Sequence, residues 1–451
     1  MQISQLSRRQ LLLASGLALA GSTSRVWAQA APQGNKGTGR MVVVLLRGAY
    51  DGLSAFVPYA DADYYASRPN IGIAAPDGST KTALKLDNTF ALHPALAPVL
   101  SLWQQGVLSF VPSAGLPAPN RSHFAAQYEM EIGQSGKTSA APGWLNKAAG
   151  SNKTTSAIGV DQRSTNAIGV GEANPAILAG EAQVKLIPRG QAAERTGVLA
   201  NDKTRQALMD LYAGNDKVSE AFRQGAGSRM QSAQELSTEK MELDGKRMGP
   251  RMDRALDKDG TPSSTQAQNA QMLAASNGAS DPVGLQLDAQ HLGTLMRNDR
   301  NLRIGFLSAG GWDTHANQGN ATGQLANNLG NLGRAIAQLR QDFSEPGDVV
   351  VVMSEFGRTA VENGTRGTDH GYGNAMWLVG NRVNGGRWHG QWTGLARGNL
   401  NEARDLPAHH DYRAVLAQVM RSTWAMPDSA LASVLPNARW DTRLDGLMRK
   451  G

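Results

Sequence analysis

Residues 41–52 read MVVVLLRGAYDG, and this stretch decides the fold class. Its first six residues form an unbroken apolar, β-branched run, which is typical of a parallel strand buried on both faces. Asp51 and Gly52 follow as a ready turn pair. In open α/β sheets, ligands bind at the carboxyl ends of the strands. The stretch therefore predicts a parallel sheet with chemistry at its carboxyl edge.

The same unit of strand, loop and helix recurs along the chain. Apolar runs at 107–111, 304–307 and 349–353 predict three further strands. Apolar residues at helical spacing predict helices over 94–105 and over the stretch around 325–339. Alternating strands and helices predict a doubly wound α/β fold, with a mainly parallel sheet covered on both faces.

One region departs from this pattern. No aromatic residue occurs between 223 and 305, and the stretch to about 278 is rich in Gln, Ser, Met, Lys and Asp. We interpret 41–451 as a single domain with a polar, largely helical insertion at about 200–300, most flexible at about 223–278. The insertion is either a lid over the site or a solubilising excursion without a role in ligand binding.

The first thirty residues have the features of an export signal. Arg8 and Arg9 precede an apolar run at 11–21, and Ala-Gln-Ala ends the segment at 28–30. The string SRRQLL resembles a bacterial twin-arginine signal, which makes the twin-arginine export machinery a partner and predicts a periplasmic or secreted protein. An ordinary secretory signal with an incidental arginine pair is the alternative. Residues 31–40 are interpreted as a linker. The apolar run is shorter than the roughly 20 residues that span a bilayer, so we expect no stable membrane anchor.

Charge and cysteine content exclude several classes of protein. Without residues 1–30 the chain has 42 basic and 38 acidic residues, a net charge of only +4. No long run of like charges occurs, so nucleic-acid binding is not expected. The absence of cysteine excludes zinc–thiolate sites and cysteine nucleophiles.

Polar residues recur where the predicted strands end. They are Asp51, Ser122, Asp313, His315, Glu355, Asp369 and His370. Because a parallel sheet brings such ends to one edge, we predict that they converge on one cleft. Their oxygen and nitrogen donors suit zinc, manganese, magnesium or calcium. Most of them also have a structural alternative: a turn at Asp51, a helix cap at Ser122, a loop held by hydrogen bonds at 313–315, or an ion pair of Glu355 with Arg358. The other histidines lack this context and are interpreted as packing or surface residues, namely His93, His291, His389, His409 and His410.

A resemblance to a known family follows from several strings. They are LLRGAYDGL, LHPALAPVLSLWQQGVLSFV, PNRSHFAAQ, GGWDTHANQG, VVVMSEFGRTAVENG and GTDHGYGNAMWLVG. In this order they resemble the bacterial family called domain of unknown function 1501, whose members typically carry twin-arginine signals. The family is similar to the alkaline phosphatase and sulfatase-like superfamily. That similarity implies a large doubly wound sheet with a metal site at its carboxyl edge.

The resemblance assigns roles to individual residues. Asp51 matches the first metal ligand and Ser122 the nucleophile. Asp313 and His315 match the next ligand pair, although one residue separates them where phosphatases usually have three. Glu355 stands where an Asp is expected, and Phe356 where a His is expected. The last ligand then comes from His370 or the Asp369-His370 pair, and the loss at Phe356 implies one metal, a differently built site, or none.

The function implied is metal-assisted hydrolysis of a phosphate or sulfate ester, in a small anionic ester or a polymer. A divalent cation would activate the Ser122 hydroxyl and stabilise developing negative charge. Arg47, Arg121 or Arg358 would hold the remaining oxygens of the anion. The lack of cysteine, together with the lack of the expected Pro and Arg after PNRSHF, argues against a formylglycine sulfatase. The competing hypothesis is a non-catalytic periplasmic binding or assembly protein on the same scaffold.

Overall fold

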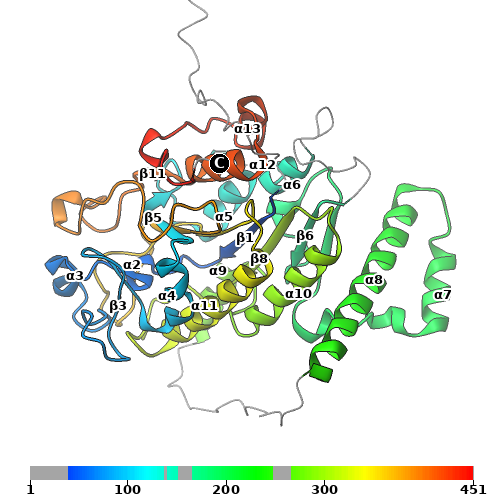
Figure 1. Ribbon diagram of the computed structural model, residues 1–451, viewed down its shortest axis with the longest axis horizontal. Coiled ribbons are helices and arrows are strands. Elements are labelled where there is room, and N and C mark those ends of the chain that lie inside the picture. Colours follow the sequence, from blue (N-terminus) through cyan, green and yellow to red (C-terminus); the bar gives the residue numbers. More distant parts are fainter. Residues whose placement is uncertain (1–38, 137–139, 151–164, 247–265, 450–451) are drawn as a thin grey trace, which may run out of the picture.

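A computed structural model describes residues 39–136, 140–150, 165–246 and 266–449 (Figure 1). An eight-stranded sheet runs through it in the order β11-β5-β10-β9-β1-β8-β6-β7. The first strand, β1 (Met41–Leu46), lies between β8 (Ile304–Ala309) and β9 (Val349–Ser354) and is parallel to both. All six residues of β1 are buried, as its apolar run predicts. Residues 1–30 and Arg8 and Arg9 lie outside the described residues.

The outer strands complete a mainly parallel sheet. They are β5 (Leu108–Gly115), β6 (Ala167–Val170), β7 (Val184–Ile187), β10 (Asn374–Val379) and β11 (His410–Asp411). Strand β10 is antiparallel to both β5 and β9, whereas the other pairs in this sheet are parallel. The predicted α/β class with a mainly parallel sheet is therefore confirmed. The carboxyl ends of β1, β5, β8 and β9 consequently share one edge.

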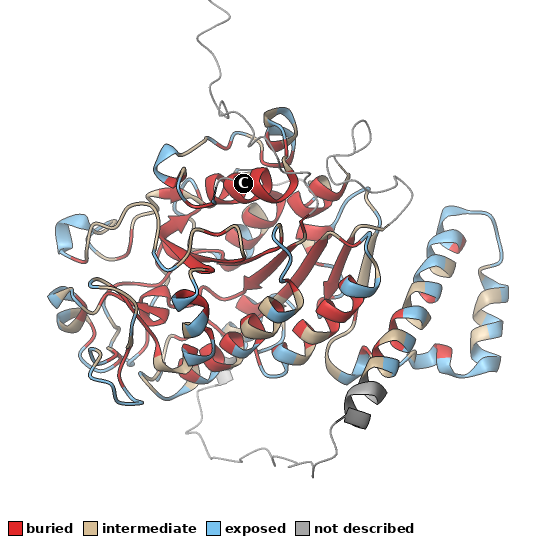
Figure 2. Cartoon of the chain, viewed as in Figure 1, coloured by how far each residue is buried: buried red, intermediate tan, exposed pale blue. Residues whose placement is uncertain are grey.

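Alternate residues of β1 enter two apolar layers. Met41, Val43 and Leu45 join one layer, and Val42 and Val44 join the other. The first layer includes residues of α5 (His123–Ile132), α6 (Trp144–Gly150), α12 (Tyr412–Trp424) and α13 (Asp428–Val434). The second includes residues of α4 (Ala97–Gln104), α10 (Leu285–Asn298) and α11 (Gln324–Asp342). The buried layers flank the sheet in Figure 2, which makes this a doubly wound arrangement.

Smaller elements follow β1 and connect the larger ones. A three-stranded sheet contains β2 (Phe56–Val57), β3 (Leu84–Lys85) and β4 (Ala91–Leu92), and two helices lie near it, α2 (Gly52–Ala55) and α3 (Ala62–Ser67). The single-turn helices are η1 (Pro94–Leu96), η2 (Ala176–Leu178), η3 (Gly190–Ala192), η4 (Gly197–Ala200), η5 (Arg397–Asn399) and η6 (Thr442–Leu444).

The region predicted as a polar insertion is largely helical over its described residues. It forms α7 (Asp202–Leu211), α8 (Lys217–Lys246) and α9 (Gln266–Ser276), and α7 and α8 project to one side of the molecule (Figure 1). Helix α7 has no buried residue, whereas α8 buries Ala226, Ala233 and Leu236. Residues 247–265 of the predicted flexible part lie outside the described residues. None of the described helices is both long and apolar enough to cross a bilayer.

Candidate metal centre

The loops that follow β5, β8 and β9 meet at the carboxyl edge of the sheet. His123 opens α5 after β5, Asp313 and His315 follow β8, and His370 lies between β9 and β10. Asp313 is buried, whereas the His315 and His370 side chains are 26% and 24% exposed. His123, Asp313 and His370 form a group whose ligand atoms lie within 4.8 Å of one another.

Three imidazole nitrogens converge on a single carboxylate oxygen. The distances from Asp313 Oδ1 to Nε2 are 3.4 Å for His123, 2.9 Å for His315 and 3.1 Å for His370. His370 Nε2 also lies 2.9 Å from His123 Nε2 and 3.0 Å from His315 Nε2. Donor atoms bound to one ion at about 2.0–2.2 Å in a tetrahedron are separated by roughly 3.3–3.6 Å. The four atoms therefore lie slightly closer together than the members of a tetrahedral ligand set.

The opposite nitrogen of each ring faces an oxygen acceptor. The pairs are His123 Nδ1 with Glu355 Oε1 at 2.7 Å, His315 Nδ1 with Asp369 Oδ1 at 3.2 Å, and His370 Nδ1 with the Arg121 carbonyl at 2.9 Å. Because a carbonyl oxygen only accepts, His370 Nδ1 is the donor, and its neutral form has a lone pair on Nε2. The same tautomer follows at the other two rings from their carboxylate partners. Three lone pairs and one carboxylate then face one another, an arrangement that requires a proton or a metal cation.

The charges around His123 favour a cation. Burial lowers its pKa, but hydrogen bonds and charges from Asp313 and Glu355 outweigh burial and raise the pKa to about 9. Burial raises the pKa of Asp313, yet the three histidines, which donate to it from Nε2 when protonated, and the charge of Arg358 hold that pKa well below its usual range. The donor set thus stabilises positive charge at its centre.

Glu355 lies behind His123 rather than among the converging nitrogens. Its Oε1 accepts from the Gly48 amide (2.8 Å) and from Gln127 Nε2 (3.0 Å) in addition to His123. Ser354 Oγ donates to the other oxygen at 3.0 Å. This buried carboxylate therefore orients the His123 ring, as carboxylates orient metal-bound histidines.

Asp51, predicted as the first ligand, does not join the cluster. Arg68 Nη1 and Nη2 donate to its two oxygens at 2.6 and 3.1 Å, and Ser54 and Gln318 donate to Oδ2, each at 2.7 Å. Burial raises the pKa of Asp51, but Arg68 outweighs burial and lowers it. Gln318 also accepts from Thr368, to which Arg358 donates. Asp51 is thus connected to the cluster only through a buried polar network.

The three arginines predicted to bind an anion differ in how many of their hydrogen-bond donors are already used by the protein. All five donors of Arg47 bind Glu131, Glu172 and Gln127, which corrects the expectation that it holds substrate. Arg358 is buried and donates to Asp313 at 2.6 Å and to Thr368.

Arg121 lies at the rim of the cluster. Its side chain is 28% exposed, and Nη2 pairs with Glu402 and Asp405. Its Nε has no hydrogen-bond partner among the described residues. Ser122 next to it is exposed at the start of α5, and its side chain makes no capping hydrogen bond. Arg121, predicted to bind an anion, therefore keeps a free donor. Ser122, predicted as the nucleophile, keeps a free hydroxyl.

Sequence reasoning missed His123. The available signal was its place beside Ser122, at the start of a helix that follows a predicted strand. Its ring packs against Phe356, with ring centroids 4.8 Å apart. Phe356, which stands where the family pattern expects a His, thus supports the imidazole of His123. His93, His291 and His410 are buried elsewhere, consistent with packing roles.

The chain matches a known protein family over most of its length. A family model described as "Protein of unknown function (DUF1501)" matches residues 38–435. A search of curated proteins found no match.

Proposed function

The chain belongs to the DUF1501 family, and we propose that it is an exported metal-dependent ester hydrolase with a fold of the alkaline phosphatase and sulfatase-like type. The observation that carries the proposal is the convergence of three imidazole Nε2 atoms on Asp313 Oδ1, each ring being held from behind by an oxygen. The natural substrates would be phosphate or sulfate esters, either small molecules or polymers.

Zinc fits the donor set best among the four cations considered. Three nitrogens and one oxygen suit zinc, whereas magnesium and calcium prefer oxygen donors. We expect one ion per chain, held by His123, Asp313, His315 and His370. Arg68 already neutralises Asp51 with two hydrogen bonds, so no second cation is needed there.

The bound ion would supply Lewis acidity to an ester oxygen and to the attacking hydroxyl. Ser122 is the nucleophile in this scheme because it is exposed and directly precedes His123. Arg121, the next residue back, would donate hydrogen bonds to the anionic ester. Glu355 keeps His123 in position, and the partly exposed rings of His315 and His370 mark the side from which substrate enters.

The decisive experiment measures metal and turnover on the same preparations. The purified parent protein and Asp63→Asn, which changes an exposed carboxylate on α3, should each contain about one zinc per chain. Asp313→Asn should lose most of it. The parent should hydrolyse p-nitrophenyl phosphate or p-nitrophenyl sulfate in a chelator-sensitive way, and Ser122→Ala should keep the metal and lose turnover. A parent that binds no divalent ion even when supplied with zinc would overturn the proposal.

One observation favours the non-catalytic alternative. Four protein donors surround the centre, which is the number in closed structural sites, whereas catalytic zinc usually keeps one position for water or substrate. In a structural site, chelation would lower the melting temperature, and Ser122→Ala would leave every measured property unchanged. Failure to hydrolyse any ester in a broad panel, with zinc bound, would select this alternative.

A further inference from the structure

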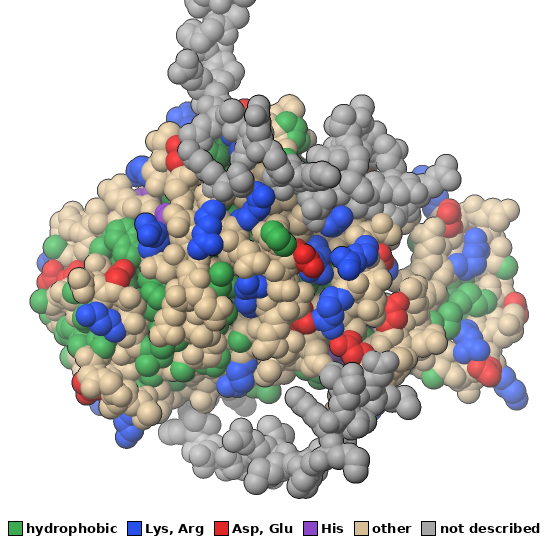
Figure 3. Space-filling model, viewed as in Figure 1, with side chains coloured by type: hydrophobic (Ala, Val, Ile, Leu, Met, Phe, Trp, Pro, Cys, Tyr) green, Lys and Arg blue, Asp and Glu red, His purple; other side chains and the backbone are tan. Residues whose placement is uncertain are grey.

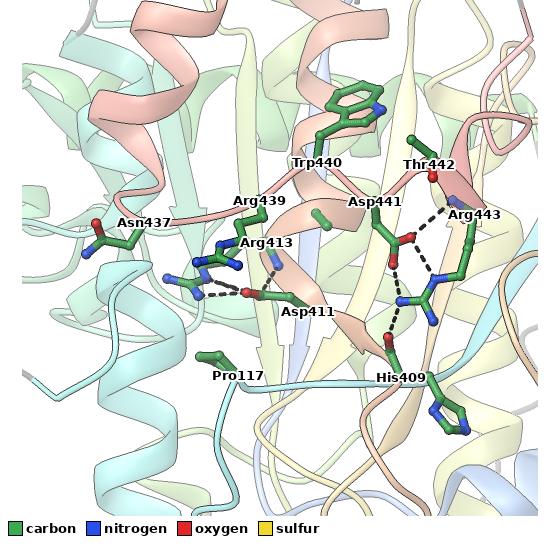
Figure 4. Close-up of a pocket in the computed structure, with 11 residues that line it drawn as sticks. Pro117, His409, Asp411, Arg413, Asn437, Arg439, Trp440, Asp441, Thr442 and Arg443 are labelled. Atoms are coloured by element: carbon green, nitrogen blue, oxygen red, sulfur yellow. Dashed lines mark hydrogen bonds and ion pairs between the residues drawn. The ribbon is translucent and has the colours of Figure 1, made fainter. Parts of the chain in front are cut away.

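A cavity of about 400 Å³ lies at the same carboxyl edge, at its β11 end. Its walls come from the residue Pro117 after β5, from the start of α12 and from the segment 437–443 (Figure 4). Strand β11 pairs with the end of β5, which places this cavity beside that strand. None of its lining residues belongs to the candidate metal centre. The volume is in the range of small-molecule sites.

The lining carries one unbalanced positive charge. Arg413, Arg439 and Arg443 face Asp411 and Asp441. Arg413 Nη2 pairs with Asp411 Oδ2 at 2.6 Å, and Arg443 Nη2 pairs with Asp441 Oδ2 at 2.8 Å. His409, which also lines the cavity, adds no positive charge at neutral pH, since burial and then Arg443 lower its pKa. Two of the three guanidinium charges are thus neutralised, and Arg439 is left.

Arg439 is exposed and forms no ion pair with another described residue. Figure 4 shows its guanidinium directed into the part of the cavity that Arg413 also faces. Arg413 is held rigidly there, since Nε donates to Asp411 Oδ1 (3.0 Å) and Nη1 to the Pro436 carbonyl (2.9 Å). Nη1 and Nη2 each carry two hydrogens, and each uses one of them in the contacts just given. Arg413 therefore keeps one donor hydrogen on Nη1 and one on Nη2 for a ligand.

Apolar surface completes the lining. Pro117 and Ala414 contribute to the walls, and Pro117 lies near the Arg413 and Asp411 side chains (Figure 4). The Trp440 indole points away from Arg413 and Arg439; its Nε1 donates to Asp445 at 2.7 Å and the Arg421 guanidinium lies 4.4 Å from the ring centroid. Apolar surface near an unbalanced guanidinium suits a ligand that has both an apolar body and one negative charge.

We propose that this cavity binds a small organic carboxylate, with Arg439 as the principal charge partner and the body of the ligand against Pro117. A monoanion balances the single excess charge, whereas a phosphate dianion would leave a negative charge uncompensated beside Asp411 and Asp441. The site is independent of the proposed hydrolysis, because it shares no residue with the metal centre.

Benzoate titration into the metal-loaded full chain, followed by calorimetry, tests the proposal. Benzoate should bind, whereas benzamide, which has the same shape without the charge, should not. Arg439→Gln should weaken benzoate binding about tenfold or more, the usual effect of losing one charge-assisted contact. Arg397→Gln, which removes an exposed arginine on η5 outside the cavity, should bind like the parent.

Several results would overturn the inference. Equal binding of benzoate and benzamide would show that charge is not recognised. Tighter binding of phenylphosphonate would assign the cavity to dianions. Binding that survives Arg439→Gln but disappears in Asp313→Asn would place benzoate at the metal centre, and a parent that does not bind benzoate at millimolar concentration would leave the cavity without this ligand class.

Discussion

Glu355 acts on the candidate metal centre through His123. It accepts four hydrogen bonds, and the one from His123 fixes which ring nitrogen carries the proton. Arg47 and Arg68 also have structural roles, because each donates all of its N–H groups to acceptors of the protein. Buried charges in this molecule therefore mainly hold other groups in position.

Glu355→Gln should lower the affinity for zinc about 10- to 100-fold, because the amide is a weaker acceptor for His123 Nδ1–H. The variant should remain folded, since the amide keeps the shape and still accepts hydrogen bonds. Competition against a fluorescent zinc chelator measures the change, with Glu345→Gln at an exposed position as the control. Equal affinities for both variants and the parent would remove Glu355 from the proposed centre.

His93 makes stability depend on pH. It is buried, its Nδ1 accepts from the Ala95 amide, and burial lowers its pKa from 6.5 to about 4. Between pH 7 and pH 5 the unfolded chain binds a proton that folded His93 does not, so the free energy of unfolding falls by about 2 kcal/mol as the pH drops.

His93→Asn keeps a capping acceptor and removes this titration. Urea unfolding at pH 7 and pH 5 should show a loss of stability about 2 kcal/mol smaller in the variant than in the parent. An identical loss in both proteins would show that His93 is protonated as readily in the folded chain as in the unfolded one.

At the scale of elements, α5 connects the centre to the core. His123, Gln127 and Glu131 recur every four residues and so lie on one face of the helix. His123 and Gln127 contact Glu355, and Gln127 and Glu131 contact Arg47. Gln127 also donates to the Ala275 carbonyl at the end of α9. The insertion therefore touches the surroundings of the centre through α9.

Helices α7 and α8 contribute unequally to stability. Leu236 on α8 is 3% exposed, whereas Leu211 on α7 is 71% exposed. Leu236→Ala should lower the free energy of unfolding by about 2–3 kcal/mol because it leaves a cavity, and Leu211→Ala should change it by less than about 0.5 kcal/mol. Chemical denaturation of the two variants checks this difference; similar values would mean that α8 does not stabilise the domain.

At the scale of the whole molecule, the carboxyl edge concentrates the candidate sites. The metal centre lies among the loops after β5, β8 and β9, and the proposed carboxylate cavity lies beyond β5 along the same edge. Figure 3 shows basic and acidic side chains interspersed over the face in view, without one dominant charged patch. This distribution agrees with the small net charge of the chain.

The predicted twin-arginine signal at the N-terminus would direct export of the whole chain. A twin-arginine signal requires both Arg8 and Arg9, so replacing both with Lys should leave unprocessed protein in the cytoplasm. Replacing Arg25 with Lys, within the same segment but outside the pair, should not impair export. Cell fractionation and immunoblotting measure both. Normal periplasmic delivery of the double variant would favour an ordinary secretory signal.

The sequence by itself determined the strands at the centre of the sheet and the edge at which the polar residues after them gather. The runs in β1, β8 and β9 are continuous and apolar, and burial on both faces requires such runs whatever the loops do. The proximity of Asp313, His315 and His370 was predictable because the ends of parallel strands share one edge. Strand β10, with its antiparallel direction, was not predicted, since direction is decided by the connection and not by side-chain pattern.

Only the tertiary structure decided which polar residues meet. His123 and His370 are separated by 247 positions, yet their Nε2 atoms lie 2.9 Å apart. Asp51 and His123 both follow apolar strands, but Arg68 on the next segment neutralises Asp51, whereas His123 faces Asp313. Local periodicity reflects the transfer of each side chain from water, which is a property of the segment alone. Ligand sets and ion pairs instead depend on how separate loops pack, and distances of a few ångströms between them decide the chemistry.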